Sequence, residues 1–158
     1  YIQKYGIDVV IPRISRTFGP TMLLSDSKAS SQFIMNAVHK ENIVLKSAGT
    51  QLYSYAYVAD IVSALLFLLV KGQKGEAYNV SNEHCDITLR TFAETLANVA
   101  GTKVIHGEAT AQEKQGFSKA TKALLDNQKI YALGWRPLYD SMEEPLKHTI
   151  KILEGSGN

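Results

Sequence analysis

Short apolar runs alternate along this chain with longer stretches whose apolar residues recur at helical spacing. Residues 9–11 (Val-Val-Ile) form a nearly continuous apolar run, which is typical of a parallel strand covered on both faces. A second buried strand is expected at 77–80, and residues 58–70 predict a strongly apolar helix that ends before Gly72. The alternation and the lack of an internal repeat predict an α/β architecture.

Local signals place the other elements. Thr88 is a suitable N-cap for an amphipathic helix over 88–100, and residues 141–144 (Ser-Met-Glu-Glu) predict a capping box for a final helix. The alternation of Tyr, Ser and Ala at 53–57 predicts an exposed strand or extended segment, whereas 107–122 is polar, lacks periodicity and predicts a loop. Further helices are expected at 1–5, 28–40 and 126–133, and short strands at 43–45 and 104–105.

The composition narrows the class of protein. A chain of 158 residues with 45% apolar and 20% charged residues fits one globular domain. The net charge of +2 and the scattered lysines disfavour a nucleic-acid-binding protein. The longest apolar run, 61–70, is about half a membrane span. The single Cys85 and the lack of Cys/His spacing predict no disulfide and no metal site, and a reducing cytoplasm is the expected location.

Two features of dinucleotide-dependent oxidoreductases are not in this sequence. There is no Gly-x-Gly-x-x-Gly, the loop that cradles a pyrophosphate at a helix N-terminus. No Tyr is followed by a Lys four residues later, and the four histidines lie far apart in the sequence. We therefore assign no catalytic residue. The chain begins at Tyr1 rather than at Met, so we expect either that an upstream segment was removed or that only part of a longer protein is present.

Three segments carry a family resemblance. Residues 13–20 (Arg-Ile-Ser-Arg-Thr-Phe-Gly-Pro) follow an apolar strand, and 53–60 (Tyr-Ser-Tyr-Ala-Tyr-Val-Ala-Asp) enter the apolar helix. Near the end, Asp126 precedes 133–137 (Leu-Gly-Trp-Arg-Pro). In this order and spacing, the chain resembles the second half of an NAD-dependent nucleotide-sugar epimerase/dehydratase of the extended short-chain dehydrogenase type.

The resemblance implies a fold and a division of the chain. It implies the C-terminal part of a Rossmann-type NAD(P)-binding fold with the small mixed α/β substrate-binding subdomain. Residues 1–26 would be the last part of the Rossmann domain, and 27–154 the substrate-binding subdomain with returning Rossmann elements. Residues 155–158 would be a tail. The N-terminal Rossmann half, which carries the Gly-rich loop and the Tyr-x-x-x-Lys pair in the family, would be a partner of this chain.

The resemblance also implies ligand contacts along the first motif. Ile14 and Ser15 would lie beside the nicotinamide of NAD. Arg16 stands where the family has an Asn that holds the nucleotide-sugar. An Arg is a fixed fork of donors suited to a carboxylate or phosphate, so the substrate would be anionic there. The alternative is an ion pair of Arg16 within its own loop.

Further substrate contacts follow from the later positions. Gln32 and Phe33 correspond to the family pair beneath the nucleotide base, although Phe33 also fits an ordinary core position. Tyr53 replaces the family Arg that grips the diphosphate, and Tyr55 matches the family aromatic. Lys119 stands near the place of a second phosphate-binding Arg, unless it is simply a solvated loop lysine. Asp60 is expected to cap its helix, and Trp135 to anchor the core.

These features predict a fragment, the substrate-binding half of an NAD-dependent nucleotide-sugar epimerase, dehydratase or decarboxylase. Such a fragment is expected to be inactive alone and to bind NAD weakly. The resemblance implies a nucleotide-diphosphate sugar as partner and a homodimeric parent enzyme. The alternative is a non-catalytic module that binds a nucleotide-sugar or another protein.

Overall fold

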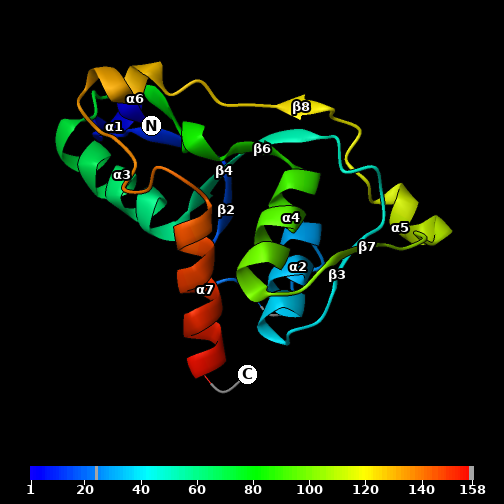
Figure 1. The fold of residues 1–158 in the computed structure, drawn as a ribbon. Coiled ribbons are helices and arrows are strands. Elements are labelled where there is room, and N and C mark those ends of the chain that lie inside the picture. The colour runs from blue at the N-terminus through cyan, green and yellow to red at the C-terminus, as the bar shows by residue number, and fades with distance from the viewer. Residues whose placement is uncertain (24, 157–158) are drawn as a thin grey trace.

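The computed structural model describes residues 1–23 and 25–156, which form a mixed α/β fold (Figure 1). Most of the expected helices and strands are present within one or two residues of their predicted bounds. In chain order the elements are α1 (Ile2–Tyr5), β1 (Ile11–Ile14), β2 (Arg16–Phe18), α2 (Ala29–Val38), β3 (Ile43–Leu45), β4 (Leu52–Tyr57), α3 (Val58–Lys71), β5 (Ala77–Val80), the 3-10 turn η1 (Glu83–Cys85), β6 (Asp86–Thr88), α4 (Leu89–Ala100), β7 (Val104–His106), α5 (Ala111–Gln115), β8 (Lys122–Ala123), α6 (Gln128–Ala132) and α7 (Glu143–Gly155).

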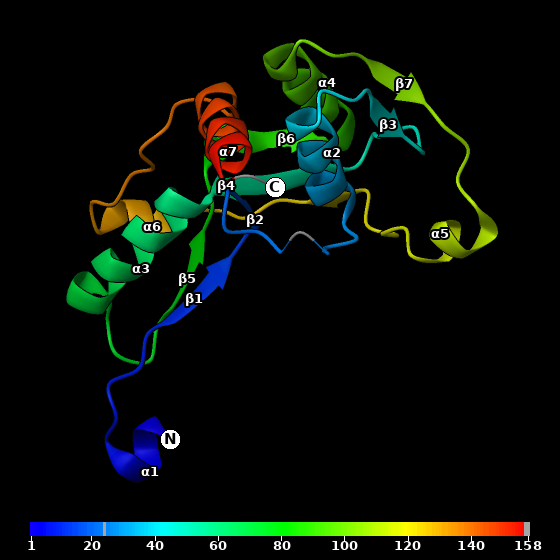
Figure 2. The same ribbon diagram turned by 90° about the horizontal axis from the view of Figure 1, so that it is seen from below.

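Strand β4 is the centre of the strand pairing. It pairs in parallel with β2 and β8 and antiparallel with β6. Two further parallel pairs, β1 with β5 and β3 with β7, form separate two-stranded sheets. Helices α2, α4 and α7 group together, apart from α3 and α6 (Figures 1 and 2). The parallel pairs separated by helices confirm the predicted α/β class.

The tyrosine-rich strand is buried, so the prediction of an exposed strand was wrong. Tyr53, Tyr55 and Tyr57 point into an apolar cluster formed mainly by α2, α4 and α7. Ala56 points the other way, into a second cluster with α3, β5 and Trp135. A strand between two clusters buries both of its faces, and the tyrosine rings fill the larger cluster.

Strand β1 shows the opposite deviation. It is parallel, as predicted, but it is not covered on both faces, because Ile11 and Ile14 are each 46% exposed. Within residues 1–23 and 25–156, β5 is its one strand partner and α3 is the helix packed on it. The apolar run 9–11 therefore keeps a face that this part of the chain does not cover.

Helix termini were predicted with mixed success. Thr88 caps α4 as expected, since its hydroxyl accepts a hydrogen bond from the Thr91 N–H and Gly101 follows with φ 71°. The capping box at 141–144 was wrong. Helix α7 begins at Glu143 without a side-chain cap, because the buried Met142 takes the N-cap position. No helix within the described residues is long and apolar enough to cross a bilayer.

Asp60 does not cap its own helix, contrary to the prediction. It is fully buried in the first turn of α3, where its Oδ1 accepts a hydrogen bond from the Leu138 N–H at 2.6 Å. Its Oδ2 accepts one from Asn82 Nδ2 at 3.2 Å. The carboxylate therefore joins three segments that are far apart in the sequence. Trp135 is buried as predicted and donates to Ser63 Oγ at 3.1 Å.

Candidate functional site

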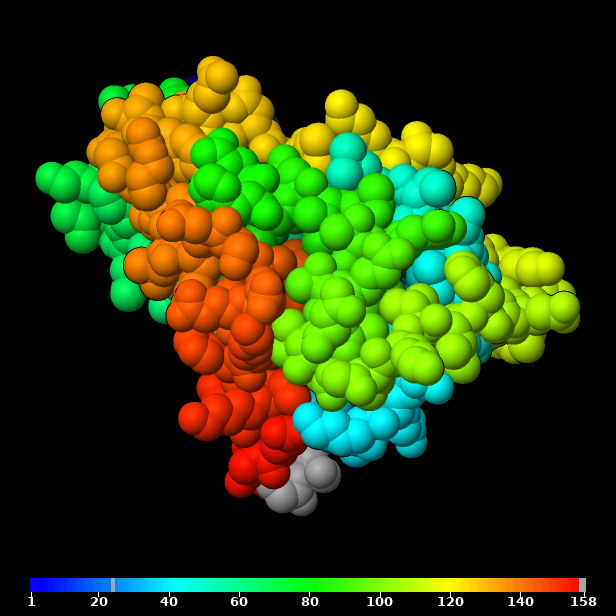
Figure 3. Space-filling view, in the orientation of Figure 1, coloured from blue at the N-terminus to red at the C-terminus, as the bar shows by residue number. Residues whose placement is uncertain are grey.

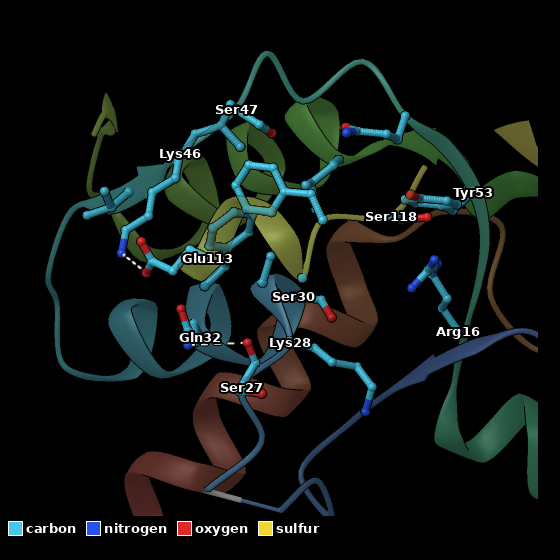
Figure 4. A pocket seen from close by; sticks show the side chains of 18 of the residues that line it. Arg16, Ser27, Lys28, Ser30, Gln32, Lys46, Ser47, Tyr53, Glu113 and Ser118 are labelled. Carbon is cyan, nitrogen blue, oxygen red and sulfur yellow. Dashed lines mark hydrogen bonds and ion pairs between the residues drawn. The ribbon is translucent and has the colours of Figure 1, made fainter. Parts of the chain in front are cut away.

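A cavity of about 650 Å³ lies between β4, the first turns of α2 and the segment around α5 (Figure 4). Its volume suits a ligand of the size of a small cofactor or nucleotide. The lining combines aromatic rings with amide, hydroxyl and charged groups. The lining residues are Arg16, Ser27, Lys28, Ala29, Ser30, Gln32, Phe33, Val44, Leu45, Lys46, Ser47, Gln51, Tyr53, Tyr55, Leu89, Gln112, Glu113, Gly116, Phe117 and Ser118.

Arg16 stacks on Tyr53 at one side of this cavity. Its guanidinium carbon lies 3.7 Å from the centre of the Tyr53 ring, a close cation–π contact (Figure 4). Parallel pairing of β2 with β4 places Arg16 opposite Tyr55. Tyr53 lies two residues earlier, on the same face of β4, so the long side chain of Arg16 reaches over its ring.

The charge of Arg16 is not neutralised by a neighbour. Among residues 1–23 and 25–156 it takes part in no ion pair, so the alternative of a loop ion pair is not observed. The other cations of the lining are each paired, Lys28 with Asp26 at 2.9 Å and Lys46 with Glu113 at 2.5 Å. The cavity therefore has an excess positive charge beside the Tyr53 ring.

Tyr55 contributes a neutral hydroxyl to the same wall. The residue is 2% exposed, and desolvation by burial raises its pKa to about 12, although Arg16 opposes the shift. It stays protonated at neutral pH. Within the described residues its Oη makes no hydrogen bond, whereas Tyr53 Oη donates to the Ala120 carbonyl at 3.3 Å. Tyr55 can therefore donate to a ligand oxygen but is a poor base.

The first turn of α2 forms another wall. Gln32 is exposed there, and its Nε2 donates to the Ser27 carbonyl at 3.3 Å, which leaves Oε1 directed to solvent or ligand. Phe33 lines the cavity but is only 4% exposed and belongs to the main apolar cluster. Its core role, which was the alternative for this residue, is thus observed.

Three of the predicted ligand residues lie outside the cavity lining. Lys119 is exposed and its neighbour Ser118 lines the cavity instead. Ile14 is 46% exposed at the end of β1, and the Ser15 Oγ is buried without a hydrogen-bond partner. The roles predicted for Ile14, Ser15 and Lys119 stay predictions.

The wall opposite Arg16 was missed by the sequence prediction. Residues 111–115 form helix α5 in the segment that was predicted to be a loop. Thr110 and Glu113 form a complete capping box, and the Glu113 carboxylate also pairs with Lys46 on the same side of the cavity, away from Arg16 (Figure 4). The Thr-x-x-Glu pattern at 110–113 was the signal that would have located this helix.

The described residues contain no group of three or more His, Cys, Asp or Glu side chains placed to hold a metal ion. Cys85 is 1% exposed, and burial raises the pKa of its thiol to about 12. A thiol with so high a pKa is a weak nucleophile at neutral pH. The cavity lining combines the guanidinium of Arg16, the neutral phenol of Tyr55, the amide of Gln32 and aromatic surface.

Comparison with known proteins identifies a family and several relatives with the same fold. Residues 1–81 match the model of the NAD dependent epimerase/dehydratase family. Over its whole length the chain is 29% identical to UDP-glucuronic acid decarboxylase 1 of Xenopus tropicalis, of which it covers 37%.

Two solved structures share the fold. UDP-glucose 4-epimerase of Thermotoga maritima, solved with UDP-glucose, superposes with a TM-score of 0.82 over 99% of this chain and 49% of its own, at 22% identity. dTDP-glucose 4,6-dehydratase of Bacillus anthracis, solved with NAD, gives 0.79 over 98% and 47%, at 21% identity. The chain thus spans about half, or less, of these proteins. With a family match over 81 of its 158 residues, it belongs to the NAD-dependent epimerase/dehydratase family.

Proposed function

We propose that this chain is the substrate-binding half of an NAD-dependent enzyme that modifies a nucleoside-diphosphate sugar. The cavity beneath Arg16 would hold the nucleotide-sugar. The relatives named above act on such compounds, as their names state, and the cavity has the size and the excess positive charge that a diphosphate-bearing ligand needs.

The observation that carries the proposal is the stacking of Arg16 on Tyr53. The resemblance places a diphosphate-binding Arg at position 53, where this chain has a Tyr. Strand β2 supplies a guanidinium to the surface of that Tyr at 3.7 Å. The charge expected from β4 is thus delivered from the neighbouring strand. Stacking fixes the guanidinium plane and leaves its edge N–H groups free to bind two phosphate oxygens.

The other side chains would complete the recognition. Tyr55 would donate its unpartnered hydroxyl to a phosphate or sugar oxygen, and Gln32 would contact base or sugar through its free carbonyl oxygen. NAD, when bound to the whole protein, would accept and return a hydride. Ile14 and Ser15 would lie along the nicotinamide, while the pyrophosphate has no Gly-rich cradle in this chain.

The proposal is tested by calorimetric titration of the chain with UDP-glucose and dTDP-glucose. We expect binding by the native chain and a loss of affinity of about tenfold or more for Arg16→Gln, since a charge-assisted contact to phosphate is lost. Lys151→Gln removes one exposed positive charge from α7, away from the cavity, and serves as the matched control. Equal affinity of the native chain and Arg16→Gln would refute the role of Arg16.

Absence of any binding by the native chain would favour the alternative of a non-catalytic module with another partner. Activity is tested separately, by co-expression with the N-terminal half of a related enzyme and an assay of nucleotide-sugar conversion. We expect no conversion by this chain alone, because neither a Tyr-x-x-x-Lys pair nor a Gly-rich dinucleotide loop is in its sequence.

A further inference from the structure

Residues 108–119 form a strap along one side of the cavity. Backbone hydrogen bonds anchor it at both ends. The Gly107 N–H donates to the Leu45 carbonyl at 3.2 Å, and the Leu52 N–H donates to the Thr121 carbonyl at 2.9 Å. Between these anchors the strap contains α5 and projects at the side of the molecule (Figures 1 and 3).

One polar contact ties the middle of the strap to the rest of the chain. Within residues 1–23 and 25–156, the hydrogen bonds of 108–119 are internal or reach the adjoining Ala120, with one exception. That exception joins Glu113 Oε1 to Lys46 Nζ at 2.5 Å. The second carboxylate oxygen of Glu113 accepts the Thr110 N–H at 2.8 Å, so one side chain both caps α5 and tethers it.

The tethered strap forms part of the cavity wall. Gln112, Glu113, Gly116, Phe117 and Ser118 all line it. Phe117 is 38% exposed, although its ring belongs to a cavity wall. An apolar ring left open at a cavity wall gains burial when a ligand fills the space beneath it.

We propose that Lys46 and Glu113 are positioning residues whose ion pair holds the strap, as a latch, against the side of the cavity and thereby retains the bound ligand. The identity of that ligand, a nucleoside-diphosphate sugar, rests on the proposed function; the latch itself rests on the contacts within the chain. Neither residue needs to touch the ligand, since both act by keeping Phe117 and Ser118 at the wall.

The chemistry of the pair suits a reversible latch. The side chains of Lys46 and Glu113 are each 39% exposed, so water and salt compete with their attraction. The hydrogen bond from Lys46, followed by that from the Thr110 N–H, lowers the pKa of Glu113 to about 2. The Glu113 carboxylate therefore stays charged over the physiological range. Opening the strap breaks one exposed ion pair rather than a packed core.

Amide hydrogen exchange of residues 108–119 tests the latch without any ligand. Lys46→Met keeps the aliphatic stem, and Glu113→Gln keeps the capping box, because Gln serves at this position as Glu does. We expect exchange to be about two- to fivefold faster than in the native chain in either single variant, and the double variant to exchange at the same rate as the single variants. The exposed pair Lys129–Glu76, also at 2.5 Å, is the matched control: Glu76→Gln should leave exchange of the strap unchanged.

Release of UDP-glucose, measured by stopped-flow, tests the consequence for binding. Both single variants and the double variant should release it faster by the same factor of about two to five, and the difference from the native chain should shrink at high salt.

Slower exchange or unchanged exchange in the single variants would overturn the latch. Faster release by Lys46→Met but not by Glu113→Gln would also overturn it, because Lys46 would then contact the ligand directly. If the native chain fails to bind UDP-glucose, the proposed function fails while the exchange measurement still decides the latch.

Discussion

At the scale of single residues, the Asp60 carboxylate shows how one buried charge holds distant segments together. Its two hydrogen bonds tie α3 to the Leu138 backbone and to Asn82, whose amide also donates to the Tyr139 carbonyl at 2.8 Å. Desolvation by burial raises the pKa of Asp60, against the effect of both hydrogen bonds. The network is therefore sensitive both to loss of the side chain and to its ionisation.

Replacing Asp60 with Ala should destabilise the chain. The Leu138 N–H and the Asn82 amide would each lose an acceptor in a buried place, which costs about 1–3 kcal/mol of unfolding free energy. Urea denaturation followed by circular dichroism measures the change. Asp8→Ala, at an exposed position, should stay within about 0.5 kcal/mol of the native chain. A similar small effect for Asp60→Ala would mean that the network carries little stability.

Asp60 should also give stability a defined pH dependence. A carboxyl with a raised folded pKa binds its proton more tightly in the folded than in the unfolded chain. Stability from this residue is therefore full below the ordinary pKa of 3.8 and falls as the pH rises through the folded pKa. Asp60→Asn cannot ionise, so the stability of the native chain relative to this variant should decrease from about pH 3 to about pH 7. Unfolding curves at several pH values test this, and an increase over that range would contradict it.

Single-residue roles were predictable from the sequence only where they depend on a local pattern. Arg16, Gln32, Tyr53 and Tyr55 were chosen by their places in motifs, and all four line one cavity. The stacking of Arg16 on Tyr53 was not predictable, because it depends on the register of β2 against β4. The assignment of residues 1–26 to the Rossmann domain stays a prediction.

At the scale of elements, α4 shows a terminus that the sequence specifies fully. Its N-cap, Thr88, was predicted, and the hydroxyl accepts the Thr91 N–H at 3.0 Å. Thr88→Ala should lower the unfolding free energy by about 1 kcal/mol, whereas Thr88→Ser keeps the acceptor and should lower it by much less. Thermal and urea unfolding of the three proteins measures the difference. Equal losses for both variants would show that the methyl group, not the cap, is what matters.

Elements were misjudged where tertiary packing overrides the local pattern. The segment 53–57 alternates Tyr with Ser and Ala, a pattern that suits an exposed strand, but clusters on both sides bury it. The capping box at 141–144 was a sound local signal, yet burial of Met142 shifts the start of α7. Conversely, the capping box at 110–113 was overlooked because α5 is short and its surroundings are polar. The burial and the end points of these elements depend on contacts with neighbouring elements, which the local sequence pattern does not contain.

At the scale of the whole molecule, the chain exposes an unusual amount of apolar side chain on α3 and β1. Leu69 is 80% exposed, Val70 78% and Leu66 60%, and Ile11 and Ile14 on the adjoining β1 are 46% exposed. Helix α3 packs on β1. Several large apolar side chains exposed on one helix are typical of a contact face rather than of a solvated one. An edge strand with an open apolar face is also a site of self-association.

We therefore expect the isolated chain to associate with itself as its concentration rises, and Leu69→Glu to reduce that association. The substitution adds a charge at a position that packs against nothing, so the unfolding free energy should change by less than about 0.5 kcal/mol. Sedimentation velocity at several concentrations measures the association. Leu138→Glu, at a 64% exposed leucine outside α3 and β1, is the control and should leave association unchanged. If Leu69→Glu and Leu138→Glu reduce association equally, the effect is one of net charge. If neither substitution reduces association, the exposed apolar residues of α3 are not the contact face, and the prediction is wrong.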